Sequence, residues 1–109
     1  MMIKNETKKT IISKQHLRKG AFGKIRGLIG EKTPRAVVFN TRFGIHTFFL
    51  LFPIDVIILD KNRRVVALRK MLKPNRIFLW NSRFTTVIEL PGGSLEKSRT
   101  QLDDLLDFT

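Results

Sequence analysis

The sequence predicts a mainly β fold, a compact antiparallel β-barrel or sandwich with one or two short helices. Three observations predict it. Runs of strand-forming residues alternate with turn residues at spacings of about 8–12 residues. After residue 36, no interval between these runs is long enough for a crossover helix, so neighbouring strands should pair antiparallel. The chain of 109 residues is 42% hydrophobic, which is enough apolar material for one buried core.

The first third of the chain carries the weakest signals. We expect a single domain over residues 1–109, in which residues 1–8 are a loosely ordered extension because they are polar and rich in lysine. The β-branched residues at 10–13 predict the first strand. Between residues 20 and 30, apolar residues recur at three- and four-residue spacing, which predicts a short helix that ends at Gly30.

The remaining chain is predicted to alternate between strands and turns. The β-branched and aromatic runs lie at residues 36–39, 45–52, 54–59, 64–72, 77–80 and 85–90. Turn-forming residues separate them at 40–44, 60–63, 73–75, 81–83 and 91–93. We expect Gly92-Gly93 to supply a positive φ, and Ser94 to be the N-cap of one helical turn over 95–99. Residues 101–108 fit an edge strand or a helix.

Charge and composition narrow the class of protein. Lys and Arg number 21 against 9 Asp and Glu, a net charge of +12, and 11 of the basic residues lie within 1–42. Such an excess attracts nucleic acids, anionic lipids and acidic proteins alike. The chain has no cysteine, which excludes a disulfide scaffold and thiol catalysis. Its most hydrophobic segment, 48–59, is shorter than the roughly 20 residues of a membrane-spanning helix, so we expect a cytoplasmic protein without a transmembrane segment.

Short motifs in a fixed order give the chain a family resemblance. They are Arg26-Gly27-Leu28-Ile29-Gly30, Ala36-Val37-Val38-Phe39, His46-Thr47-Phe48, Pro53-Ile54-Asp55-Val56, Ile58-Leu59-Asp60, Val65-Val66, Lys73-Pro74 and Glu89-Leu90-Pro91-Gly92-Gly93. Over residues 18–108 the chain resembles the family catalogued as domain of unknown function 192. The resemblance implies a compact, mainly β structure and no established biochemical role. The chain departs from many members at residues 48–52, which are all apolar here where those members have a polar segment.

Asp55 is the most informative candidate residue because it is the only charge within residues 48–59. An ionised carboxylate in apolar surroundings costs several kcal/mol unless it is hydrogen-bonded or paired. One interpretation is a structural carboxylate bonded to backbone amides of the turn after Pro53 or to a nearby arginine. The alternatives are a site residue with a perturbed pKa, or an exposed position on a bulge.

Three further residues are candidates for a binding site with Asp55. His46 could approach Asp55 if the chain folds back at Pro53, which would give a base oriented by a carboxylate. No serine lies in a nucleophile-elbow sequence, so a hydrogen-bonded structural histidine is the alternative. Glu89 could share a two-carboxylate cleft with Asp55 or form a structural ion pair. Arg42 completes this set. The two histidines have no metal-ligand spacing, and neither a metal nor a cofactor is predicted.

A separate set of residues could contact nucleic acid or another polyanion. Single-stranded nucleic acid binds where cations share a face with aromatic rings that stack on bases. Phe43, Trp80 and Phe84 are the aromatic residues near polar ones. The candidates for this surface are Lys24, Arg26, Arg63, Arg64, Arg69, Lys70, Lys73, Arg76 and Trp80. Binding of this kind weakens strongly as salt rises.

Three functions follow from these observations. The first is a non-enzymatic binding or interaction module of unknown ligand, favoured because no catalytic constellation is visible. The second is a nucleic-acid-associated protein that uses its basic surface. The third is a small enzyme with a carboxylate site at Asp55. A concave pocket around Asp55 would support the enzyme, whereas an Asp55 satisfied by backbone amides would support the binding module.

Overall fold

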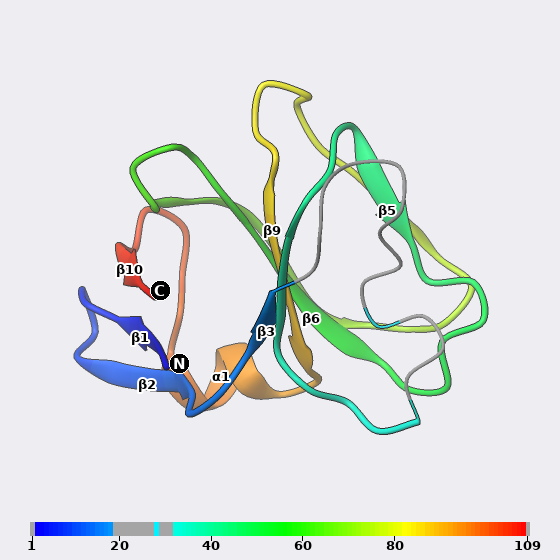
Figure 1. Ribbon diagram of the computed structural model, residues 1–109, viewed down its shortest axis with the longest axis horizontal. Coiled ribbons are helices and arrows are strands. Elements are labelled where there is room, and N and C mark those ends of the chain that lie inside the picture. The colour runs from blue at the N-terminus through cyan, green and yellow to red at the C-terminus, as the bar shows by residue number, and fades with distance from the viewer. Residues whose placement is uncertain (1, 19–27, 29–31, 109) are drawn as a thin grey trace.

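A five-stranded sheet forms the centre of the molecule. The computed structural model describes residues 2–18, 28 and 32–108 (Figure 1). Its central sheet has the order β3-β4-β9-β6-β7, with β3 at Leu17–Arg18, β4 at Val37–Asn40, β9 at Thr86–Pro91, β6 at Ile54–Leu59 and β7 at Val65–Leu72. The pairs β4–β9, β9–β6 and β6–β7 are antiparallel, and only the β3–β4 pair is parallel among the described strands. The predicted antiparallel pairing therefore holds for the core of the sheet.

One face of the central sheet is covered by both ends of the chain. A three-stranded sheet of order β10-β1-β2 lies there with helix α1, on the left of Figure 1. These elements are β1 at Ile3–Asn5, β2 at Thr10–Ser13, α1 at Ser94–Ser98 and β10 at Leu106–Asp107. Their apolar residues, such as Ile3, Leu95 and Leu106, pack with Ile57 and Ile88 of the central sheet to form the first core.

The other face of the central sheet packs against a two-stranded sheet. Strand β5, Gly44–His46, pairs antiparallel with β8, Ile77–Leu79. Inward-facing Phe78 meets Val56, Ile58 and Val87 in the second core. Because both faces of the central sheet are covered, every residue of β6 is buried. The mainly β, compact fold with a short helix is confirmed, and the three described sheets do not close into a barrel.

The N-terminal residues differ from the expected loose extension. Ile3 and Asn5 are buried, and β1 is the middle strand of its sheet. The side-chain Nδ2 of Asn5 donates to Asp104 Oδ2 at 2.8 Å, and Lys8 Nζ lies 2.9 Å from the same carboxylate. Burial by itself raises the pKa of Asp104, but the hydrogen bonds from Asn5 and Lys8 outweigh it and hold that pKa below its ordinary value. A buried polar network therefore joins the two ends of the chain.

The segment predicted as one strand over 45–52 is mostly a loop, and this prediction is wrong. Strand β5 ends at His46, and residues 47–53 turn. The cause is Thr47, which is fully buried. Its hydroxyl donates to the Lys73 carbonyl at 2.7 Å and accepts from the Arg76 amide at 2.8 Å, while its own carbonyl accepts from the Leu50 amide. These bonds hold the backbone away from an extended course.

Most other element predictions agree with the structure. Strand β6 has the predicted bounds, and Gly93 has a φ of 96°. The helical turn begins at Ser94 rather than after it: Gly93 is the N-cap, and the Ser94 hydroxyl donates to the Pro91 carbonyl at 2.6 Å. The predicted helix over 20–30 lies outside the described residues except for Leu28, which is buried in the second core. Across the part of the chain that the structure describes, no helix is long and apolar enough to span a membrane.

Candidate functional site

Asp55 is a fully buried carboxylate whose two oxygens both accept backbone hydrogen bonds. Oδ1 accepts from the Met71 amide and Oδ2 from the Leu95 amide, each at 2.8 Å. The Met71 amide is available because the β6–β7 register shifts between Ile54 and Val56, and Met71 has a φ of 52°. The donors come from β7 and α1 rather than from the turn after Pro53. Asp55 therefore ties the start of the helix to the sheet, and its oxygens are occupied.

Glu89 lies on the opposite face of the central sheet from Asp55. In the β6–β9 register, Asp55 is opposite Leu90 and Glu89 is opposite Val56. Paired residues share a face, and successive residues alternate, so Asp55 faces the first core and Glu89 the second. Glu89 is buried, and its Oε1 accepts from the Leu28 amide at 2.8 Å. The two carboxylates therefore do not share a cleft.

His46 and Arg42 lie away from Asp55, on and beside β5. His46 is exposed, and its ring stacks on Phe48 with centroids 5.1 Å apart. Asp55 is buried toward the first core, whereas β5 packs against the other face of the central sheet and leaves His46 exposed, so the two residues do not form the expected pair. Arg42 is exposed in the loop between β4 and β5. Among the described residues, no group of His, Asp and Glu is arranged to hold a metal ion.

The predicted aromatic contacts for nucleic acid are only partly accessible. Trp80 is half-buried, and its indole Nε1 donates to the Phe84 carbonyl at 2.7 Å. Phe84 is also half-buried, and the Arg83 guanidinium lies 5.6 Å from its ring centre. Phe43, by contrast, is 64% exposed.

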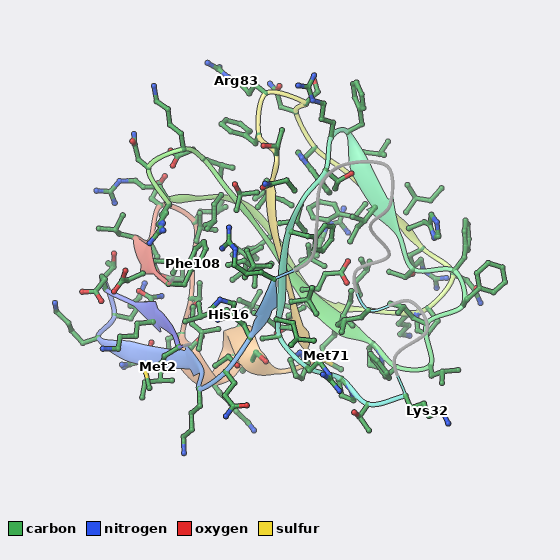
Figure 2. The ribbon with its side chains drawn as sticks, viewed as in Figure 1. Met2, His16, Lys32, Met71, Arg83 and Phe108 are labelled. Carbon is green, nitrogen blue, oxygen red and sulfur yellow. The ribbon has the colours of Figure 1, made fainter. Side chains whose placement is uncertain are left out.

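The predicted cationic residues do not gather on one face. Arg63 lies over the Phe108 ring at 4.4 Å, and Arg64 donates to the Asp103 carbonyl at 2.9 Å, both beside β10. Figure 2 shows Phe108 on that side of the molecule, away from the β5 side. Arg69 covers the ring of Phe78, and Lys70 pairs with Glu96 at 3.2 Å. Lys73 and Arg76 lie at the base of the 47–53 loop through their backbone bonds to Thr47. Lys24 and Arg26 fall outside the described residues.

The outer side of the β5–β8 pair is an apolar surface that the sequence interpretation missed. Ile45 and Phe78 oppose each other in the register and face the second core. Their neighbours therefore point outward: Leu79 lies across Gly44, and Ile77 is paired with His46, on which Phe48 stacks. Leu79 is 69% exposed and Ile77 is 60% exposed. We call this surface, together with the adjoining loop residues, the β5–β8 face: His46, Phe48, Phe49, Leu51, Ile77 and Leu79.

The 47–53 loop adds the most exposed apolar side chains of that face. Phe49 is 80% exposed and Leu51 is 73% exposed, whereas Leu50 between them is buried in the second core. Phe49 also has a φ of 70°, a backbone conformation that is costly for a bulky residue and is often found at functional sites. The available sequence signal was the unbroken Phe48-Phe49-Leu50-Leu51-Phe52 run. That run predicts burial on both faces unless a turn separates its members.

Charge is distributed unevenly around the β5–β8 face. The chain has no Asp or Glu within residues 32–54 or 61–88, the two segments that contain β5, its loop and β8. Within the described part of the chain, neither Lys73 nor Arg76 has an ion-pair partner. Among the residues that the structure describes, the exposed acids are Glu96 on α1, Asp107 on β10 and Asp103 in the segment before β10. Within the described part of the chain, the exposed cations Lys73 and Arg76 therefore lie at the base of the 47–53 loop, and the exposed acids Asp103 and Asp107 lie on the side of β10 (Figure 1).

Comparisons with known proteins identify sequence relatives and solved structures of similar fold. A UPF0127 protein of Pyrococcus horikoshii is 40% identical over 88 residues, which cover 75% of this chain and 76% of that protein. A crystal structure of a protein of unknown function from Novosphingobium aromaticivorans has a TM-score of 0.67 and 13% identity, and covers 98% of this chain and 82% of its own. A putative transcription regulator of Sinorhizobium meliloti also has a TM-score of 0.67, with 14% identity, over 85% of this chain and 78% of its own.

These two solved structures share the fold. Over residues 7–108 the sequence matches the family of domain of unknown function 192, described as "Uncharacterized ACR". This match covers almost the whole chain and agrees with the resemblance seen in its motifs. The chain therefore belongs to the domain of unknown function 192 family, whose biochemical activity is not assigned.

Proposed function

We propose that this protein is a non-enzymatic binding module and that the β5–β8 face is its binding surface. The observation that carries the proposal is the exposure of Ile77 and Leu79 on β8, together with Phe49 and Leu51 in the loop that directly follows its partner strand β5. Monomeric soluble proteins rarely expose a contiguous apolar patch of this kind unless it binds something. Burying each such side chain against a partner gains about 1.5–3 kcal/mol.

The surroundings of the candidate catalytic residues support binding rather than catalysis. Asp55 is fully buried, and each of its oxygens accepts a backbone amide, from Met71 and from Leu95, so the carboxylate is held inside the fold and is not exposed to a substrate. Glu89 faces the other core, and His46 stacks on an exposed phenylalanine. A catalytic site would need at least two of these groups to converge on one reacting atom.

The proposal is tested by covalent footprinting of the full chain with a diffusible carbene reagent. The protein is labelled alone and after incubation in a lysate of its source cells, and labelled peptides are quantified by mass spectrometry. We expect protection of residues 46–51 and 77–79 in the lysate. Leu102, another exposed leucine, lies beside Asp103 at the other end and is the internal control. Equal labelling of the β5–β8 face with and without lysate contradicts the proposal.

Nucleic acid is a second candidate partner for the same end of the molecule. The net charge of +12, the exposed ring of Phe43 and the exposed cations Lys73 and Arg76 favour it. Its test is the binding of a fluorescent single-stranded oligonucleotide across a salt series. We expect a steep loss of affinity with salt if this candidate is correct. Undetectable binding at low ionic strength removes it.

A further inference from the structure

We propose that the β5–β8 face docks on an anionic lipid bilayer, with Phe49 and Leu51 inserted at the boundary between headgroups and acyl chains. This inference rests on the proposed binding function and names the partner of the same surface. It requires three features: apolar side chains that project, a backbone that holds them there, and cations at the depth of the lipid phosphates.

The loop presents its apolar side chains at a point where the backbone is held. Buried Leu50 and the fully buried Thr47 fix the loop from inside, while Phe49 and Leu51 on either side of Leu50 are directed to solvent. Phenylalanine and leucine are the residues that peripheral proteins bury at the bilayer interface. Because the loop is already ordered, insertion costs little additional conformational entropy.

Cations lie at the base of this loop rather than at its tip. The Thr47 hydroxyl bonds to the backbone of both Lys73 and Arg76, which places these two exposed residues behind the inserting side chains. Negatively charged leaflets attract such residues by roughly a fivefold gain in affinity each. Among the described residues, the exposed acids Asp103 and Asp107 lie at or beside β10, on the other side of the molecule from β5 (Figure 1), and Glu96 on α1 is paired with Lys70 at 3.2 Å.

The chemistry of the face favours lipid over two other partners. Leu51, Ile77 and Leu79 are aliphatic and cannot stack on bases, whereas acyl chains accommodate them without directional requirements. A second copy of the chain would bring Lys73 and Arg76 of both molecules together, and each copy carries a net charge of +12. Repulsion between like charges therefore opposes self-association through this face.

The absence of cysteine gives a direct test of insertion. Leu51→Cys and the matched control Leu102→Cys are each labelled with an environment-sensitive nitrobenzoxadiazole fluorophore. The labelled chains are mixed with vesicles of phosphatidylcholine alone, or of two parts phosphatidylcholine to one part phosphatidylglycerol. We expect a blue shift and increased emission for the label at position 51, only with phosphatidylglycerol vesicles, and no change at position 102.

Sedimentation with the same vesicles gives the energetic test. We expect Phe49→Ser to weaken partitioning by about tenfold or more, and Lys73→Gln by about fivefold. The controls Leu102→Ser and Lys61→Gln, at the other end and in the β6–β7 turn, should match the wild type. Circular dichroism verifies that each variant is folded.

Three results would overturn the inference. One is no association with phosphatidylglycerol vesicles at low salt. Another is vesicle association that Phe49→Ser leaves unchanged, because such association would not involve insertion of this side chain and would be purely electrostatic. The third is a preference for a single-stranded oligonucleotide that Phe49→Ser weakens, which would assign the face to nucleic acid. Protection of the β5–β8 face by a lysate cleared of membranes, combined with no vesicle binding, refutes the lipid partner but leaves the binding function standing.

Discussion

Replacing Asp55 with asparagine should destabilise the protein although it removes only one oxygen. The carboxylate is fully buried and accepts one backbone hydrogen bond on each oxygen, both at 2.8 Å. Asparagine keeps one acceptor and turns an NH2 group toward the other amide, so either Met71 or Leu95 loses its partner. A hydrogen bond to a charged group contributes about 1.5–3 kcal/mol, and a buried amide without an acceptor costs about 1 kcal/mol or more. We therefore expect Asp55→Asn to lower the free energy of unfolding by roughly 2–4 kcal/mol.

Urea unfolding measures this loss directly. Circular dichroism and the fluorescence of the single tryptophan, Trp80, should give coincident transitions if the domain unfolds in one step. Asp60→Asn is the matched control, because Asp60 Oδ1 also accepts two backbone amides, from Asn62 and Arg64. That turn is partly exposed and asparagine can keep the same oxygen, so the cost should stay below about 1 kcal/mol. Equal effects of the two substitutions would refute the assignment of Asp55 as the buried link between sheet and helix.

Three further outcomes follow from single residues. The pKa of Asp104 is held below its ordinary value, so its charged form stabilises the fold above about pH 4 and that contribution is lost as the pH falls through the lowered pKa. Asp104→Asn should lower stability at neutral pH and flatten the acid side of the stability curve measured by urea unfolding; an unchanged curve contradicts this. Gly44→Ala places a Cβ 2.6 Å from a backbone carbonyl of β8 and should lower the free energy of unfolding by about 1–3 kcal/mol. Gly92→Ala meets the flexible side chain of Met71 and should lower it less in the same assay. The reverse order would show that the close approach in β5 is relieved by a shift of the backbone. Thr47→Val removes the hydroxyl bonds at the base of the loop, so amide exchange over residues 48–52 should accelerate; exchange at the wild-type rate would mean that other contacts hold the loop.

Prediction succeeded where local pattern and burial coincide. Residues 54–59 form a continuous β-branched run bounded by Pro53 and a turn, and β6 has the same bounds. Gly93 takes the positive φ that the turn before a helix requires. The solitary Asp55 among apolar residues was expected to need hydrogen-bond partners, and it has two.

Prediction failed where distant partners decide the structure of a segment. The apolar residues 48–52 are compatible with a buried strand, but Thr47 bonds to residues 26 and 29 positions further along the chain and bends the segment into a loop. Three-residue β1 is too short to give a period-two signal, and it is stabilised by β10 at the other end of the sequence. The residues within each of these two segments carry no information about the distant residues to which the segment bonds.

The sequence by itself thus determined the positions of most strands, the turn at Gly93, the strong positive charge and the requirement that Asp55 has hydrogen-bond partners. Each of these depends on neighbouring residues or on composition. Tertiary structure alone decided which backbone amides donate hydrogen bonds to Asp55, that Glu89 faces the opposite core, and that Phe49 and Leu51 are exposed. The physical reason is register: pairing between strands assigns every side chain to one face or the other. A shift of one residue would exchange the buried and exposed side chains of the β5–β8 pair, and in β6 and β9 it would exchange the side chains that face the two cores.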